Sequence, residues 1–446
     1  MNNYSLWSLR LGYTNNQAHK IESLGIENFV KKSIDEKFSS DIPPFLKNSP
    51  KNIKEFKNQK KYNKAEELIK IQKWWIDKMR TENYPLREKM VCFLHNHFVA
   101  SSNKVTINRW IFEHNSILRT NAFGNLKDLC KKILKCNATL DYLDNNTNRK
   151  NNLNENLSRE LLELFTLGLN NYTEKDVQSG AKALAGLSFG DIYGVYNHKY
   201  ECNEKINYLN HTGVFKLDDL IDIIFKHPKC PYLFTKKILN WFIYDNPTEE
   251  LIIYYGNYLK YVNFELRPFL IKLFTEEFNK ETAGSKIKDP LLYAIQLLDE
   301  LKLSNSDSKF IVNFIKNQGM PLLMHKSVKG WKGGKEWLST QILFNRNKIA
   351  NQLCKGENNT LYKINLNQTN IKINERIPNI KRKPNCNYSC IKTELCDKLI
   401  FSIDENLQKN IDQIIKHDFD PKAKNSDRTI LRLFNYLVTT PEYQLL

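Results

Sequence analysis

The chain has 446 residues, of which 41% are hydrophobic and 12% aromatic, enough apolar material to bury a large core. This composition excludes fibrous and intrinsically disordered proteins, and no run of about eighteen apolar residues marks a membrane-spanning helix. The formal net charge of +18 would suit a nucleic-acid-binding protein, but the lysines are spread along the whole chain and no nucleic-acid-binding motif accompanies them. Nucleic-acid binding therefore ranks lowest among the functional hypotheses.

The N-terminal segment MNNYSLWSLRLGYTNNQAHK has no basic start followed by an apolar core and a small-residue cleavage site. A cytoplasmic protein is therefore the default expectation. The nine cysteines are mostly scattered singly, which fits reduced thiols. The only cluster is Cys386, Cys390 and Cys396. A zinc site would need a fourth ligand that is not close in sequence, so we expect no metal there and can name no cofactor.

Helical periodicity dominates the chain, because apolar residues recur at steps of three and four. Hydroxyl caps followed by acids open two of these segments, at Thr173 and Thr248. The pattern predicts an all-α protein with little or no β structure. Helices are expected over 17–37, 62–80, 85–99, 108–121, 125–136, 155–169, 173–186, 217–227, 230–244, 248–261, 265–278, 288–302, 307–317, 335–354, 403–417 and 426–440.

Three segments depart from this pattern. Residues 38–61 are rich in Pro, Lys and Asn and predict a surface excursion, whereas 355–395 are polar and basic and predict a long loop or insertion. Residues 187–215 are the best candidate for irregular or short β structure. The main helical domain then comprises 1–354 and 396–446.

The segment LREKMVCFLHNHFVASSN places a His-x-His pair on a predicted helix. On a helix, His97 shares the apolar face with Leu86, whereas His95 lies nearly opposite, so the two cannot grip one metal ion. We interpret His97 as a buried, hydrogen-bonded residue. His95 and Asn96 are the better candidates for residues that face a site.

The polar stretch YLDNNTNRKNNLNEN leads into the next helix, with Asp144, Asn145 and Asn154 near its start. Such side chains beside a helix N-terminus could bind an anion, a sugar or a hard cation. Asn and Asp also form turns and helix caps, and that alternative is the more common one.

The helix 155–169 is covered with leucine except for one narrow polar stripe that contains Glu155, Arg159, Glu160 and Glu163. A helix that is apolar around most of its circumference is usually interior. Glu155 and Glu163 are each four residues from Arg159, so one guanidinium could serve two carboxylates. Glu160 falls at the border of the apolar surface.

Two interpretations of this stripe remain open. It could be a structural ion network, since buried charges must be paired. Alternatively, it could form a pocket in which Glu160 or Glu163 has a raised pKa and acts as a general acid or base, with Arg159 orienting a carboxylate or another anion.

The segment KSVKGWKGGKEWLSTQILFNRNKIANQL contains a tight Gly-Trp loop before a helix. The glycine spacing excludes a Walker phosphate-binding loop. Gly330 could let Trp331 fold back onto the helix for packing, or Trp331 could stack on a sugar or base.

Taken in order, these stretches resemble a bacterial family catalogued as domain-of-unknown-function family 1800. The resemblance extends through GVFKLDDLIDIIFKHP and LFTKKILNWFIYDNP and covers nearly the whole chain. It implies a large, mainly helical fold and no established activity. Members are often encoded beside a protein that resembles the sulfatase and alkaline-phosphatase superfamily, which implies a partner. Many members carry an export signal, and none is visible here.

The chain departs from the family pattern in two places. Ala185-Gly186-Leu187 stands where the family usually has Thr-Gly-Trp. Tyr200, Glu201 and Lys205 stand where it usually has a His-Asp pair followed by Lys, with His198 and His211 nearby. If the missing pair were catalytic, the protein would be a non-catalytic member.

The first hypothesis is a hydrolase or transferase that acts on a polar polymer or modified peptide. Its catalytic candidates are Glu160, Glu163 and His95, and its substrate-binding candidates are Asn96, Asp144, Asn145, Asn154, Arg159 and Trp331. The second is a non-catalytic assembly or maturation partner of the phosphatase-like neighbour. Convergence of the polar residues on one cavity would favour the enzyme.

Overall fold

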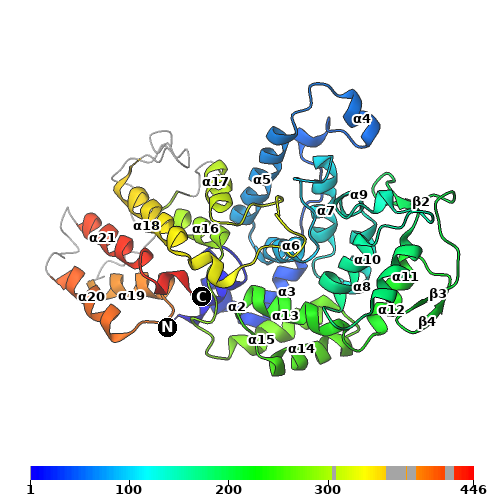
Figure 1. Ribbon diagram of the computed structural model, residues 1–446. Helices are drawn as coiled ribbons and strands as arrows, with labels where there is room; N and C mark the ends of the chain where they lie inside the picture. Colours follow the sequence, from blue (N-terminus) through cyan, green and yellow to red (C-terminus); the bar gives the residue numbers. More distant parts are fainter. Residues whose placement is uncertain (1, 304–307, 358–377, 379–387, 417–425) are drawn as a thin grey trace.

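The computed structural model describes residues 2–303, 308–357, 378, 388–416 and 426–446 (Figure 1). Within these residues the fold is all-α, as predicted. The helices of the first half are α1 (Asn3–Arg10), α2 (Ala18–Leu24), α3 (Ile26–Asp35), α4 (Ile53–Asn58), α5 (Lys64–Thr81), α6 (Leu86–His97), α7 (Asn108–Thr120), α8 (Leu126–Lys135), α9 (Asn137–Tyr142), α10 (Asn156–Glu160), the π-helix η4 (Leu161–Thr166) and α11 (Glu174–Leu184).

The second half adds ten α-helices. These are α12 (Leu217–Lys226), α13 (Cys230–Phe242), α14 (Glu249–Tyr261), α15 (Leu266–Phe278), α16 (Pro290–Glu300), α17 (Lys309–Asn317), α18 (Thr340–Lys355), α19 (Tyr388–Leu399), α20 (Glu405–Lys416) and α21 (Ser426–Val438). Short 3₁₀ turns lie between them, at η1 (Asn15–Gln17), η2 (Pro44–Leu46), η3 (Asn145–Thr147), η5 (Gly334–Leu338) and η8 (Glu442–Gln444).

The described β-strands form two small antiparallel hairpins, both in the predicted segment 187–215. They pair β1 (Leu187–Ser188) with β2 (Val195–Tyr196), and β3 (Ile206–Tyr208) with β4 (His211–Gly213). Both lie at one end of the molecule, beside α11 and α12 (Figure 1).

Several helix boundaries follow directly from local chemistry. The side chain of Thr173 accepts a hydrogen bond from the backbone of Asp176, whose carboxylate accepts one in return, so a capping box starts α11 as its sequence predicts. Thr248 caps α14 more simply, because its hydroxyl oxygen accepts a hydrogen bond from the backbone amide of Leu251. The expected single helix over 17–37 is instead broken at Gly25, which has a φ of +72° and separates α2 from α3.

The helices enclose one continuous apolar core that includes residues from both ends of the chain. The central element is α6, which packs against α3, α5, α7 and α13 and buries every residue except Asn96. Helices α18 to α21 form one flank of the molecule and α8 to α12 the other (Figure 1). No described helix is both long and apolar enough to cross a membrane.

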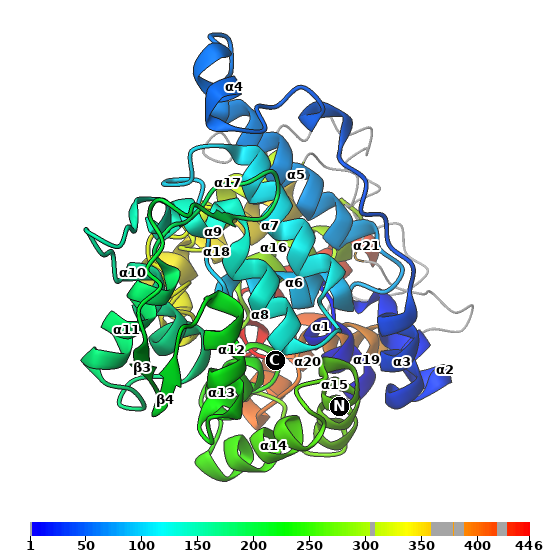
Figure 2. The same cartoon turned by 90° about the vertical axis from the view of Figure 1, so that its right-hand side faces the viewer.

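The predicted surface excursion at 38–61 contains η2 and α4, and α4 projects from the body in both views (Figures 1 and 2). In the predicted loop 355–395, residues from Tyr388 onward form the start of α19. Most of the rest of that segment lies outside the described residues. The division into one helical domain with an insertion stays a prediction.

Candidate functional site

The predicted helix 155–169 changes its hydrogen-bonding pattern in the middle. α10 continues directly into the π-helix η4, in which the backbone amide of Leu167 donates to the carbonyl of Leu162, five residues earlier, across 2.9 Å. The hydroxyl of Thr166 donates to the carbonyl of Leu161 at 2.5 Å. Turns of π-helix are rare and frequently occur at functional sites. This one begins immediately after Glu160 and contains Glu163.

Lys237 of α13 reaches this widened turn. Its Nζ donates to the carbonyl oxygen of Leu164 at 2.7 Å and lies 3.3 Å from Nδ1 of His97. Burial lowers the pKa of Lys237 to about 8, although the charge of Glu160 acts in the opposite direction. Burial, and then the charge of Lys237, holds the pKa of His97 well below its usual value. His97 is therefore neutral, and its Nδ1 can accept a hydrogen bond from the ammonium of Lys237.

Glu160 is half-buried, and its Oε2 atom is buried without a hydrogen-bond partner among the described residues. Burial is the main cause of its raised pKa, and the neighbouring charge of Glu163 adds to it. The positive charges of Lys329, Arg159 and Lys237 oppose the shift without cancelling it. A carboxyl group in this state holds its proton at a higher pH than an exposed glutamate does.

Glu163 is also half-buried, and its Oε2 accepts a hydrogen bond from the hydroxyl of Tyr172 at 3.1 Å. The neighbouring carboxylates therefore have different surroundings, because Glu163 has a partner within the protein and one oxygen of Glu160 has none. Of the two predicted acid/base candidates, Glu160 is the better placed to exchange a proton.

A cavity of about 390 Å³ lies where the C-terminal end of α6, α13 and the loop before η5 meet. Two predicted substrate-binding residues line it, namely Asn96 and Trp331, and so does Lys237. Asn96 and Trp331 are also joined directly, because the backbone amide of Trp331 donates to Oδ1 of Asn96 at 2.7 Å. Gly330 has a φ of +82° and packs so closely on Asn96 that a Cβ atom would clash there.

Trp331 is packed and lines the cavity at the same time. Its ring stacks on His325 at 4.2 Å and on Trp241 at 6.2 Å between ring centroids. Trp331 thus packs on rings from α13 and from the loop that precedes it. Its predicted packing on the helix that follows, and stacking on a ligand, both stay predictions.

His97 is buried and hydrogen-bonded as expected, but His95 does not face the cavity as expected. His97 lines the cavity, whereas His95 is fully buried among His114, His325 and Trp75, with centroid distances of 5.0 to 5.7 Å. The expectation failed because it assumed that α6 has a solvent-facing side, and this central helix has none. The placement gives no support to a catalytic role for His95.

Arg159 already forms ion pairs with two carboxylates. One of them is the predicted Glu155, at 3.1 Å, but the other is Glu174 of α11, at 2.7 Å, in place of Glu163. The guanidinium therefore ties α10 to the start of α11, as in the structural interpretation of this arginine. Its role in orienting a ligand stays a prediction.

The asparagine-rich loop before α10 is an internal hydrogen-bond network. Buried Asn145 donates to the carbonyls of Leu184 and Leu187, and Asn154 donates to the carbonyl of Asp144. Asp144 itself forms an ion pair with Lys104 at 2.5 Å. These contacts support the turn-and-cap interpretation, and Asp144, Asn145 and Asn154 do not line the cavity.

The residues at the departures from the family pattern form a separate polar cluster. Glu201 is 7% exposed, and its carboxylate lies 2.5 Å from Nδ1 of His198 and 2.6 Å from Nζ of Lys216. Tyr200 stacks under the guanidinium of Arg149. A histidine, a carboxylate and a lysine are thus brought together here, with His198 almost fully exposed.

The described residues contain no group of three or more His, Cys, Asp or Glu side chains that could hold a metal ion. Seven cysteines are free and buried, Cys396 among them, whereas Cys390 is disulfide-bonded. Cys386 lies outside the described residues.

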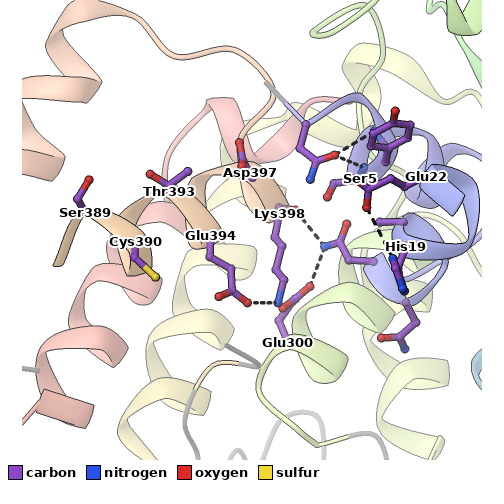
Figure 3. A pocket seen from close by; sticks show the side chains of 15 residues that line it. Ser5, His19, Glu22, Glu300, Ser389, Cys390, Thr393, Glu394, Asp397 and Lys398 are labelled. Carbon is purple, nitrogen blue, oxygen red and sulfur yellow. Dashed lines mark hydrogen bonds and ion pairs between the residues drawn. The ribbon is translucent and has the colours of Figure 1, made fainter. Parts of the chain in front are cut away.

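A larger cavity of about 900 Å³ lies where η1 and α2 face α19 (Figure 3). Burial raises the pKa of Glu300 in this cavity to about 7, and Nδ2 of Asn15 donates to its carboxyl at 2.7 Å. Lys398 is paired with Glu394 at 3.1 Å. None of the predicted site residues lines this cavity. The smaller cavity has Asn96 and Trp331 in its wall, whereas Glu160, Glu163 and Arg159 are not among its lining residues, so the predicted convergence on one cavity is only partial.

Comparison with models of known protein families matches residues 5–445 to DUF1800, described as a protein of unknown function. The chain belongs to the DUF1800 family. The match covers nearly the whole chain and confirms the resemblance that its motifs indicate. No curated protein and no solved structure matches the chain. For this DUF1800 protein, the functional argument therefore depends on the geometry of the cavity and its neighbours.

Proposed function

We propose that this DUF1800 protein is a hydrolase or transferase acting on a polar polymer or modified peptide, with Glu160 and Lys237 as its proton-exchanging pair. The observation that carries the proposal is that the pKa values of Glu160 and Lys237 are shifted toward each other. The pKa of Glu160 is raised and that of Lys237 is lowered to about 8, so the two values lie closer together than those of an exposed glutamate and an exposed lysine.

The cavity supplies the place where such a pair could act. Lys237 and Lys329 line it, and the charges of both lysines act on Glu160, which lies beside the cavity and is not one of its lining residues. The loop of Gly330 and Trp331, fixed by the side chain of Asn96, forms another part of the wall.

In hydrolysis, the neutral amine of Lys237 would accept a proton from the attacking water while the protonated Glu160 gives its proton to the leaving oxygen. One bond forms between water oxygen and substrate, and the bond to the leaving group breaks. The Lys237 ammonium then loses its proton to solvent and the Glu160 carboxylate takes one up from solvent, which restores the starting pair. General acid and base groups with pKa values near the working pH perform such transfers most efficiently.

The test compares wild type with Glu160→Gln and Lys237→Met on a panel of para-nitrophenyl phosphates, sulfates and glycosides and of peptidyl para-nitroanilides. Turnover by the wild type should fall by at least about a hundredfold in both variants, the usual size of an acid/base contribution. Glu174→Gln is the control, because it removes an exposed carboxylate that pairs with Arg159.

The melting temperature separates catalysis from structure. It should be nearly unchanged in Glu160→Gln, because Gln has the same shape and the replaced Oε2 has no partner to lose. A large loss of stability, or full activity in this variant, would contradict the proposal.

A further inference from the structure

The cavity of about 390 Å³ is lined by donors that the protein leaves unused. Trp241 and Trp331 are 8% and 9% exposed, and both line it. Their indole Nε1 atoms are buried, and neither has an acceptor among the described residues. Leaving a buried N–H without an acceptor costs free energy, so each of these two donors would be stabilised by an acceptor from outside the chain, either water or a ligand group.

The charges at the cavity have one predominant sign. Lys236, Lys237 and Lys329 line it, and none of them lies within ion-pair distance of a described carboxylate. The lining carboxylate, Asp245, is already engaged: Oδ2 accepts from the backbone amide of Ile287 at 2.9 Å, and Oδ1 lies 3.5 Å from Nζ of Lys286.

We propose that this cavity binds an oxyanion, in the form of a phosphoryl, sulfuryl or carboxylate group of the substrate. Such a group accepts hydrogen bonds in several directions and carries the charge that the exposed Lys236 and Lys329 attract. The inference deepens the proposed function, because it names the substrate group that the same cavity holds. Its test, however, requires no turnover.

The geometry assigns different parts to the donors. The indoles of Trp241 and Trp331, stacked with an interplanar angle of 27°, contribute neutral N–H donors at the buried wall. Lys236 and Lys329 are exposed and contribute charge at the entrance, whereas Lys237 is half-buried between them and the π-helix.

The experiment measures binding of inorganic phosphate, sulfate and acetate to the full chain by isothermal titration calorimetry at matched ionic strength. Wild type should show one saturable site for at least one anion, and the anion that binds identifies the group. Lys329→Met removes charge at the entrance, and Trp331→Phe removes an N–H while keeping an aromatic ring. Each should weaken binding by about tenfold, as expected for a lost hydrogen bond or ion pair to a charged group.

Lys175→Met is the matched control, because Lys175 is exposed on α11 and does not line the cavity. It should leave binding unchanged. If Trp331→Phe does not fold, Trp241→Phe removes the other indole donor in the same way. The absence of binding by all three anions, or equal affinities of wild type, Lys329→Met and the tryptophan variants, would overturn the inference.

Glu160→Gln distinguishes this inference from the proposed function. Removing a carboxyl group near the lysines should preserve or strengthen anion binding while turnover is lost. If the wild type binds an anion but turns over no substrate of the panel, the oxyanion site is supported and the proposed enzymatic function is contradicted. If the wild type turns over substrate but binds none of the three anions, the proposed enzymatic function is supported and the oxyanion site is contradicted.

Discussion

Nζ of Lys237 donates a hydrogen bond to the carbonyl oxygen of Leu164 across 2.7 Å, and this bond joins α13 to the π-helix η4. In an α-helix that carbonyl would accept from an amide four residues further on. The π-turn changes this spacing, and a lysine from a distant part of the chain supplies a donor. The bond therefore connects the acid-bearing helix to the cavity wall.

Lys237 should be the most readily acylated lysine near neutral pH, because the neutral amine is the reactive form. Its rate of modification by acetic anhydride should rise with pH to a midpoint near its pKa of about 8. Peptide mass spectrometry with isotope-labelled reagent measures this rate, and Lys236, exposed on the same helix, provides the internal reference. In Glu160→Gln the midpoint should shift downward. The negative charge of Glu160 raises the pKa of Lys237, and this variant removes that charge. Matching profiles for Lys236 and Lys237 would contradict the assignment.

The buried histidines should make the protein less stable in mild acid. Burial lowers the pKa of His95 to about 4 and holds those of His97, His114 and His325 well below the ordinary value. Between the unfolded pKa of about 6.5 and these folded values, the unfolded chain binds more protons, so stability falls as pH falls. Each histidine contributes at most roughly 1.4 kcal/mol per pH unit to this slope.

Glu300 opposes the effect, because burial raises its folded pKa to about 7 and the folded state binds the extra proton between about 4.5 and about 7. Urea denaturation at several pH values from about 5 to about 7 measures the net slope. His325→Phe should reduce it, whereas His19→Phe should not, because His19 is exposed. A slope that is the same in His325→Phe and wild type would show that the buried imidazole does not contribute.

Sequence periodicity predicted the helices well, because apolar residues at three- and four-residue steps mark the buried face of each helix. The helices it missed are α1, α4, α9 and most of α19. α4 and α9 have six residues each, and α4 buries none of its residues, so it leaves no apolar stripe to detect. The π-turn was also missed, since a change in hydrogen-bond spacing over six residues barely alters the order of polar and apolar side chains.

The candidate site could be predicted only in part. Glu160 follows from the narrow polar stripe on a leucine-rich helix, and Asn96 and Trp331 follow from the histidine and glycine segments. The face of His95 could not be predicted, because a helix buried on all sides has no outward direction. Lys237 left a usable signal that was overlooked. It stands four residues after Leu233 and four before Trp241, as a lysine interrupting an apolar stripe, and all three line the cavity.

Gly330 should be the residue on which the shape of the cavity wall depends most. Alanine at this position would be strained, because φ is +82°, and its Cβ would lie 2.4 Å from Oδ1 and 2.7 Å from the carbonyl oxygen of Asn96. The backbone of Asn96 cannot yield as a flexible side chain can. The loop must therefore move, which breaks the bond from the Trp331 amide to Asn96. Gly330→Ala should lower the free energy of unfolding by about 3 kcal/mol or more and abolish anion binding.

Gly319→Ala separates backbone strain from the clash. Gly319 has the same φ of +82°, but a Cβ atom there would meet nothing within 4 Å. That variant should lose only about 1 kcal/mol, the cost of the left-handed conformation for alanine, and should retain anion binding. Urea denaturation and calorimetry on both variants make the comparison. Equal losses of stability with anion binding intact in both would mean that contact between Gly330 and Asn96 does not set the position of Trp331.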